Sequence, residues 1–341
     1  MAPALRRGFL VAIPVGIAAL VELELKTPAT GAVTIGASIT GFVAFDAPAR
    51  TRFVWQLGVA PFIGVAAVLG AITGDSGPLA VATMAVIATA GAMTVAVSRR
   101  LAIAAINCVL ALLIAQGLSL EASDTAQILV LGGAGALGQA ALSLVVALVQ
   151  GPLERVHPVA GARAAFAAIG ENLSLGSPSM RHALRSGGAL ALAVASYHVV
   201  ALGRHGYWVP LTVLFVLKAG RAETYERIGM RIVGTVVGLA VATGLTVIVG
   251  EGVAANVAIL VVAAAVAYAM LAIEYALFTL GITIYIVTLA HAMGESAVDA
   301  VGERALGTAV GIAIVMLAFA VWRDRSSPLP AEAPAVGGVG Q

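Results

Sequence analysis

The feature that most limits the fold is a succession of long apolar runs, separated by short stretches that hold charges, glycine or proline. A helix that crosses a bilayer needs about 20 apolar residues, within a range of about 17–25. Twelve runs of roughly this kind can be read along the chain: 8–25, 30–46, 53–73, 78–97, 101–118, 126–149, 186–203, 206–219, 229–250, 253–270, 273–292 and 304–322. The sequence therefore predicts an all-α polytopic membrane protein with about twelve transmembrane helices in a lipid bilayer.

Composition excludes the main alternatives to a membrane protein. Hydrophobic residues make up 60% of the 341 residues and charged residues 11%, and the mean hydropathy is +1.03. Soluble domains average about 45–50% apolar and about 25% charged residues, so this chain has too little charge to cover a soluble core. The basic residues are scattered, which excludes a nucleic-acid groove. The single cysteine, Cys108, lies within an apolar run, so we expect neither a disulfide nor a thiolate metal site.

The distribution of Lys and Arg gives the expected orientation. With the N-terminus in the cytoplasm, only Lys26, Arg204 and Arg304 of the 19 Lys and Arg residues fall on the outer side, and the other sixteen lie on the inner side. An excess of basic residues is typical of cytoplasmic loops. We therefore expect both termini in the cytoplasm.

The chain also repeats itself. The segment 5–8 (Leu-Arg-Arg-Gly) matches 184–187 (Leu-Arg-Ser-Gly) at an offset of 179 residues. Gly64 and Gly70 match Gly238 and Gly244 at an offset of 174. Each half holds six runs, an even number, so both halves start on the same side of the membrane. The sequence predicts two parallel six-helix repeats related by an axis along the membrane normal.

These repeats divide the chain into four parts. We expect residues 1–150 to form the first six-helix membrane repeat and 184–325 to form the second. Residues 151–183 contain three prolines and an Ala-rich stretch, and we expect them to form a cytoplasmic linker with one short helix. Residues 326–341 are rich in proline and glycine and are expected to be a disordered tail.

Corresponding interrupted segments in two halves are the best pointer to a transporter's binding site. In the first half, Lys26 precedes a helix start rich in Gly and Pro, and Arg204 does so in the second half. Helix N-termini attract anions, so a cation beside each one suits a carboxylate. The predicted substrate-binding residues are Lys26, Thr30, Arg204, His205, Tyr207, Trp208 and Thr212, with the two aromatic rings as a wall and the threonines as hydroxyl donors. The alternative is an interfacial belt, where aromatic and cationic side chains also gather.

Two further groups of ionisable residues are candidates. Glu22 and His198 occupy similar depths in the two halves and are the candidates for proton coupling, because ionisable groups within spans are costly and usually functional. The alternative for Glu22 and for the neighbouring Glu24 is a location at the water interface, with local pairing to Lys26. Arg227 and Arg231 share a helix face, since they are four residues apart. They either receive an anion from the cytosol or anchor their helix by the positive-inside effect.

Glycine pairs spaced by four residues predict close helix packing. They occur at Gly70 and Gly74, at Gly234 and Gly238, and at Gly307 and Gly311. Such seams pack helices within the chain, and we also expect a homodimer. The chain lacks a metal-binding cluster, a nucleotide-binding loop and a nucleophile motif. We therefore expect neither an enzyme nor a bound cofactor.

The stretch 181–244 carries a resemblance to a known family. Its core Tyr-Trp-Val-Pro-Leu-Thr (207–212) is followed by Arg-x2-Gly-Thr (231–235), a combination that is hard to obtain by chance. This pattern resembles the fusaric acid resistance-like (FUSC) family, also called aromatic acid exporters, which is distantly related to the aluminium-activated malate channels of plants. The resemblance implies a bacterial inner-membrane transporter that moves aromatic or other organic anions outward, often as a dimer. The first half follows the pattern only in outline.

The leading functional hypothesis is therefore a transporter that exports small organic, aromatic carboxylate anions, with coupling to protons left open. The second hypothesis is a passive anion channel on the same scaffold. Both need a cationic pathway lined by helix dipoles, so the sequence does not separate them. A membrane enzyme or assembly scaffold is the third reading, and it has no catalytic cluster to support it.

Overall fold

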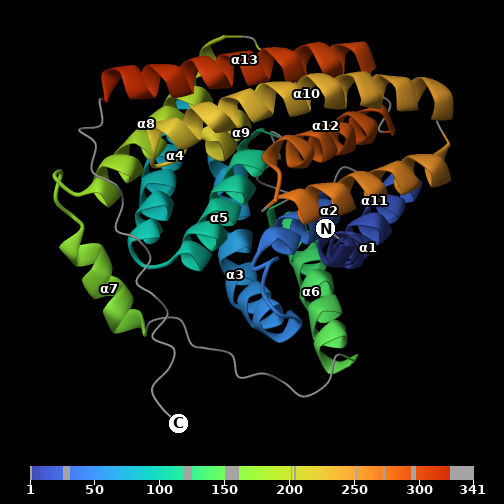
Figure 1. The fold of residues 1–341 in the computed structure, drawn as a ribbon, viewed down its shortest axis with the longest axis horizontal. Coiled ribbons are helices and arrows are strands. Elements are labelled where there is room, and N and C mark those ends of the chain that lie inside the picture. Colours follow the sequence, from blue (N-terminus) through green and yellow to red (C-terminus); the bar gives the residue numbers. More distant parts are fainter. Residues whose placement is uncertain are drawn as a thin grey trace.

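The computed structural model of this chain describes residues 2–25, 31–117, 125–149, 161–200, 202, 205–250, 252–271, 273–292 and 297–322. Within these ranges the secondary structure is entirely helical, as the sequence predicts (Figure 1). Lys26, Thr30, Arg204 and the expected disordered tail lie outside the described residues.

Each of the twelve predicted runs contains a helix. The helices of the first half are α1 (Ala2–Leu25), α2 (Gly31–Phe42), α3 (Ala49–Gly74), α4 (Gly77–Met93) with the 3-10 turn η2 (Thr94–Ala96), α5 (Arg99–Gly117) and α6 (Thr125–Val149). A short amphipathic helix, α7 (Ala162–Glu171), lies in the predicted linker. The second half holds α8 (Pro178–Val199), α9 (Trp208–Val216), α10 (Arg221–Val249), α11 (Val253–Met270), α12 (Tyr275–Ala292) and α13 (Ala297–Val321). The helix α8 begins at Pro178, six residues before the predicted start of the second repeat at residue 184.

Nine helices in the described part of the chain are long and apolar enough to cross a membrane. Two of the other predicted spans are short, since α2 has 12 residues and α9 has nine. At 1.5 Å per residue these correspond to about 18 and about 14 Å, well below the ~30 Å of a bilayer core. The third, α8, is long enough but carries Arg181, His182 and Arg185 in its first turns. The prediction of twelve complete spans therefore holds for nine helices by length and composition.

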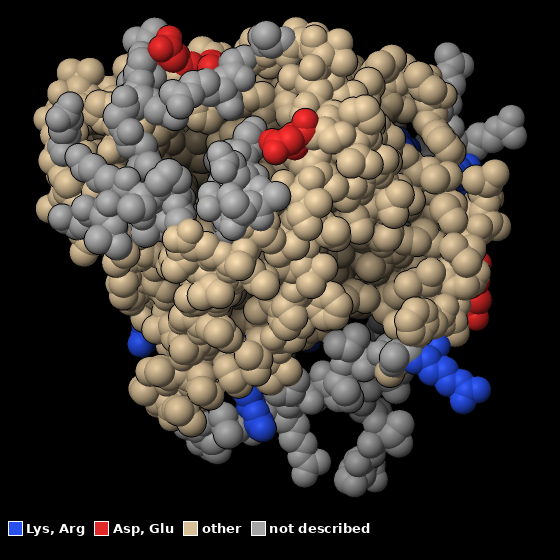
Figure 2. Space-filling view, turned by 180° about the vertical axis from the view of Figure 1, so that it is seen from behind, with Lys and Arg blue, Asp and Glu red and all other residues tan. Residues whose placement is uncertain are grey.

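The outer surface of the bundle is apolar. Large hydrophobic side chains are exposed on several helices, for example Phe62, Val130 and Val236 at 66%, 68% and 61%. Figure 2 shows a wide area across the middle of one face without charged side chains. An apolar surface of this extent needs lipid to cover it, so the chain is a multi-pass membrane protein.

The helices of the two halves pack in matching pairs. The first helix of each half packs on the fourth helix of the other half, so that α1 lies along α11 and α8 lies along α4. Within each half the third helix packs on the fifth (α3 on α5, α10 on α12) and the second on the sixth (α2 on α6, α9 on α13). These pairings place the short helix α9 in the interior, where seven of its nine residues are buried.

Arginines near the start of each half make matching contacts as well. Arg7 on α1 donates to the carbonyl oxygens of Phe45 and Asp46, which lie in the connection from α2 to α3 (3.2 and 2.9 Å). Arg185 on α8 donates to the carbonyl of Ala219, in the connection from α9 to α10 (2.6 Å). In both halves the first helix thus holds the loop that follows the short second helix.

The predicted glycine seams are confirmed. A Cβ on Gly70 or Gly74 would meet α5, and a Cβ on Gly234 would come within 2.3 Å of the carbonyl oxygen of Ala276 on α12. On α13, a Cβ on Gly311 would lie 2.6 Å from the Cβ of Thr212. Helices that approach this closely tolerate only glycine at the contact.

Candidate functional site at the start of α9

Trp208 anchors the first turn of α9 in the protein interior. Its side chain is 1% exposed, and Gly307 on α13 lets the backbone of α13 approach it, since a Cβ there would lie 3.0 Å from the Cβ of Trp208. The ring of His205 stacks on the Trp208 ring, with centroids 4.4 Å apart and an interplanar angle of 12°. The start of α9 is therefore held against α13 by an aromatic stack.

Hydrogen bonds to Glu303 tie the same turn to α13. His205 Nδ1 lies 2.6 Å from Oε2 of Glu303, and the backbone N–H of His205 donates to the same oxygen at 3.1 Å. Both side chains are partly exposed, at 14% and 21%. The carboxylate of Glu303 is thus directed at His205.

Arg304, the residue after Glu303, is buried. Its side chain is 1% exposed, and its guanidinium carbon lies 5.4 Å from the centroid of the Trp208 ring, within cation–π range. Nε and Nη1 have no hydrogen-bond partner among the described residues. The side chain of Arg304 therefore lies inside the bundle beside α9, and its predicted location on the outer side of the membrane stays a prediction.

Arg231 on α10 is the second buried arginine of this region. Its side chain is 1% exposed, and its Nε and Nη1 also lack a partner within the part of the chain that the structure describes. Its charge and that of Arg304 are close enough to repel one another. No ion pair joins either guanidinium to a carboxylate of the described residues, and the carboxylate of Glu303 is in contact with His205.

Two buried guanidinium groups without counter-ions are expensive. Moving one ion from water to a protein interior costs several kcal/mol unless an opposite charge and hydrogen bonds offset it. A planar carboxylate offers two acceptor oxygens that match the parallel N–H groups of arginine. The arrangement of Arg231 and Arg304 is therefore suited to an anion, and the Trp208 ring beside it is suited to an aromatic group.

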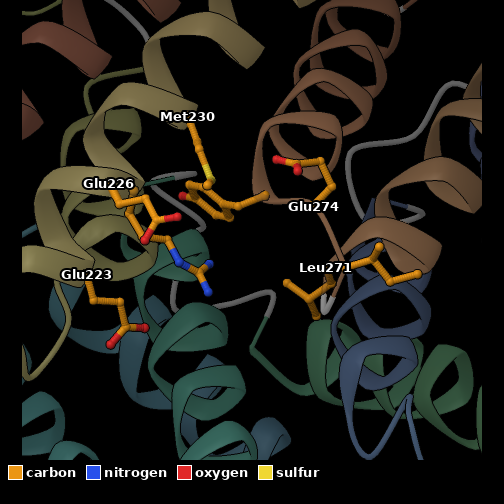
Figure 3. A pocket seen from close by; sticks show the side chains of 8 residues that line it. Glu223, Glu226, Met230, Leu271 and Glu274 are labelled. Carbon is orange, nitrogen blue, oxygen red and sulfur yellow. The ribbon is translucent and has the colours of Figure 1, made fainter.

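A pocket of about 220 Å³ opens at the end of α10 that the charge distribution predicts to be cytoplasmic. Its lining residues come from α10 and from the connection between α11 and α12: Glu223, Glu226, Arg227, Met230, Leu271, Ile273, Glu274 and Tyr275. In Figure 3, Glu223 and Glu226 face the pocket from one side, and Leu271 and Glu274 lie on the other. Arg227 stacks over the Tyr275 ring at 4.3 Å. Arg227, which the sequence predicts to be a cytoplasmic entry residue for the anion or an anchor of its helix, therefore lines this pocket.

Lys218 lies close to this pocket, in the turn between α9 and α10. The pKa of Lys218 is lowered to about 8, chiefly by burial and also by the charge of Arg227, while Glu223 acts in the opposite direction. The ammonium group therefore titrates much closer to neutral pH than an ordinary lysine.

The structure brings together only some of the residues predicted from the sequence. His205, Tyr207, Trp208 and Thr212 lie at the start of α9, but the hydroxyl of Thr212 donates to the carbonyl of Trp208 at 3.0 Å and is not available as a donor to substrate. His198 is exposed at the end of α8, where its ring packs on Tyr197. Lys26, Thr30 and Arg204 lie outside the described residues, as does the side chain of Glu22.

The sequence reading missed Glu303 and Arg304. The available signal was their position near the start of the last apolar run, because charged residues within spans are rare and usually functional. Within the described ranges, no three His, Cys, Asp or Glu side chains come together as a metal site would require.

Comparison with known proteins relates this same region to a family. Residues 189–318 match the family described as fusaric acid resistance protein-like. The inner membrane protein YccS of Escherichia coli is 29% identical over 155 residues, which is 45% of this chain and 21% of YccS. YhfK of E. coli is 32% identical over 157 residues (46% of this chain, 22% of YhfK), and an uncharacterized protein of Haemophilus influenzae is 26% identical over 175 residues (50% and 24%).

These matches cover less than a quarter of the length of each of the three relatives. No solved structure matches this chain significantly. The comparisons support a relationship to the fusaric acid resistance-like family over residues 189–318, which include Trp208, Arg231 and Arg304.

Proposed function

We propose that this chain is a fusaric acid resistance-like transporter that exports organic, preferably aromatic, carboxylate anions across a bacterial inner membrane. The observation that carries the proposal is the pair of buried guanidinium groups, Arg231 and Arg304, which have no counter-ion among the described residues. A bound carboxylate supplies the missing charge and accepts the unmade hydrogen bonds. Each charge-assisted hydrogen bond contributes about 1.5–3 kcal/mol.

Trp208 gives the site its expected preference for aromatic substrates. Its indole ring is next to Arg304 and stacked on His205, so a substrate ring can be held beside an existing aromatic pair. Aromatic pairs contribute about 0.5–1.5 kcal/mol beyond the burial of their area. Aromatic acids are therefore expected to bind better than aliphatic acids of equal charge.

The membrane arrangement that we propose has two parallel six-helix repeats and both termini in the cytoplasm. The matching helix pairs of the two halves and the matching contacts of Arg7 and Arg185 support the repeat. The similarity to the inner membrane protein YccS and the excess of Lys and Arg on one side support the location and the orientation. In this arrangement the pocket at Arg227 faces the cytoplasm.

Counterflow in proteoliposomes tests the proposal. With the membrane potential clamped at zero by equal potassium concentrations and valinomycin, vesicles loaded with an unlabelled aromatic carboxylate are expected to accumulate the labelled acid transiently. A passive channel gives no such overshoot under this condition. A panel of aromatic and aliphatic acids and of neutral and cationic analogues measures the selectivity. Arg304→Gln and Arg231→Gln are expected to abolish counterflow, while the control Arg100→Gln, at an exposed position on α5, leaves it intact. If both buried-arginine variants transport as well as the natural chain, the proposal is contradicted.

A further inference from the structure

We infer that the substrate anion moves along the contact between α10 and α12, from the pocket at Arg227 past Tyr275, Arg231 and Arg304, and then over the hydroxyl groups of Thr235, Thr279 and Thr283. This inference rests on the proposed function and adds the route. Arg231, Thr235, Tyr275, Thr279 and Thr283 lie on the two facing helices α10 and α12, and each of them is at least nine-tenths buried.

The spacing places these residues on matching helix faces. Tyr275, Thr279 and Thr283 follow one another at intervals of four on α12, so they share one face. Arg231 and Thr235 are four apart on α10. The faces meet, because a Cβ on Gly234 would lie 2.7 Å from the Cβ of Thr279.

The hydroxyl groups on these faces make no hydrogen bond within the described part of the chain. Buried threonines in helices can satisfy their hydroxyl on a carbonyl one turn earlier, and Thr224, Thr246 and Thr308 do so at 2.8, 3.0 and 2.9 Å. Thr235, Thr279 and Thr283 make no such bond, and within the described residues their oxygens have no partner at all. The hydroxyl of Tyr275 lacks one as well.

An unmade hydrogen bond in a protein interior costs about 1–3 kcal/mol per group. Four such groups along one contact, together with Arg231, form a set of buried polar side chains. The four hydroxyls and Nε and Nη1 of Arg231 have no hydrogen-bond partner among the described residues. Polar groups of this kind are the expected lining of a substrate route through a membrane protein. A carboxylate that passes along α12 can accept a hydrogen bond from each hydroxyl in turn.

Tyr275 connects the route to the pocket. Its ring is covered by the guanidinium of Arg227 at 4.3 Å, and its phenol is close enough to Arg304 to interact with it electrostatically. The pocket itself contains the carboxylates of Glu223, Glu226 and Glu274 beside Arg227. Because acidic residues outnumber the cation there, the preference for anions begins beyond Tyr275, which closes the inner end of the route.

The glycines at this contact allow α10 and α12 to separate. Gly234 and Gly238 bring α10 close to α12 without interlocking side chains. A small separation of the two helices is enough to expose the threonine hydroxyls to the pocket. The route is closed in this structure and opens by that separation.

Cysteine accessibility in proteoliposomes tests the route. In a Cys108→Ser background, Thr279→Cys and Thr283→Cys are each treated with a negatively charged methanethiosulfonate and, separately, with a positively charged one of the same size. The control is Thr246→Cys, which replaces a buried threonine on α10 whose hydroxyl is already bonded. We expect both α12 cysteines to react with the anionic reagent and the control to remain unmodified.

Protection by substrate completes the test. If the cysteine reacts only when the site is empty, the transported carboxylate at ~100 Kd lowers the rate of modification by about 100-fold, because it lowers the fraction of empty sites by that factor. Variants that transport normally but show no reaction or no protection overturn the route, while the proposed function stands. Equal reaction with the cationic reagent supports the route and contradicts the selectivity for anions.

Thr279→Val and Thr283→Val provide a second test that keeps the shape of the side chains. We expect their KM for transport to rise several-fold while their thermal stability equals or exceeds that of the natural chain, because an unsatisfied hydroxyl is removed. Unchanged transport in the double variant overturns the inference.

Discussion

The guanidinium carbon of Arg304 lies 5.4 Å from the centroid of the Trp208 ring, so a buried positive charge and a buried aromatic face share one position in the bundle. The two residues come from α13 and α9, the sixth and second helices of the second half. Gly307 makes the contact possible by removing the side chain that would separate these helices. The geometry therefore links selection of charge and selection of ring shape in a single contact.

Trp208→Leu separates these two selections. The substitution keeps an apolar side chain but removes the ring, so we expect the affinity for aromatic carboxylates to fall by up to about tenfold, as a loss of ~0.5–1.5 kcal/mol of aromatic contact implies. The affinity for aliphatic carboxylates should change little. Competition for transport by paired aromatic and aliphatic acids measures the ratio. Trp55→Leu on α3 is the control, and an unchanged ratio in Trp208→Leu would rule out the aromatic wall.

Glu303→Gln changes the charge beside Arg304. A carboxylate one residue away partly neutralises the local positive potential, so its removal should strengthen anion binding by about tenfold, the effect of ~1–2 kcal/mol of Coulomb energy at an effective dielectric constant near 20. The glutamine still accepts a hydrogen bond from His205. The matched control is Asp75→Asn, an exposed acid at the end of α3. Equilibrium binding at low ionic strength measures the change, and weaker binding in Glu303→Gln is incompatible with the site.

The helices could be located from the sequence, but their depth in the membrane and the burial of their side chains could not be predicted from it. The run around α9 is apolar from Trp208 to Val216, yet the helix ends there because the chain turns toward Lys218 and Ala219, whose carbonyls accept hydrogen bonds from Arg185. Such a long-range contact leaves no periodic signal. The glycine seams could be predicted because close packing depends on side-chain size alone.

The burial of Arg304 could not be predicted for a similar reason. Its position near the start of the last run, after an acidic stretch, favoured the outer surface. Whether the side chain points to lipid, to water or into the bundle depends on which helix packs on α13. The partner is α9, which is separated from α13 by about 80 residues of sequence.

A polar network in the first half should be important for stability. Arg52 Nε donates to Ser143 Oγ at 3.0 Å, and that hydroxyl donates to Gln56 Oε1 at 2.7 Å, all in buried positions. Ser143→Ala leaves two buried groups unpaired, each at a cost of about 1–3 kcal/mol. We expect a clear drop in the thermal unfolding temperature in detergent. Ser38→Ala removes a hydroxyl that has no partner in the described structure and should be neutral; equal effects of the two changes would refute the network's role.

The seam between α10 and α12 should reject even one methyl group. A Cβ at Gly234 would come within 2.3 Å of a backbone oxygen, which cannot rotate away, whereas a Cβ at Gly244 on the same helix meets nothing within 4 Å. Gly234→Ala is expected to lower the unfolding temperature and to reduce transport. Gly244→Ala should stabilise the helix by up to about 1 kcal/mol, since alanine is the better helix former. Thermal unfolding of both variants measures this difference, and equal unfolding temperatures would contradict the close packing at Gly234.

The measurement that tests the anion site most directly is thermal unfolding of the natural chain and of Arg304→Met, each with and without an aromatic carboxylate. The natural chain is expected to gain stability from the acid, by about 2.7 kcal/mol at ~100 Kd. Arg304→Met removes a buried charge that has no counter-ion among the described residues, so it should be more stable than the natural chain in the absence of the acid and should gain nothing from its addition. If Arg304→Met is instead less stable and still responds to the acid, Arg304 is a structural residue and the anion site lies elsewhere.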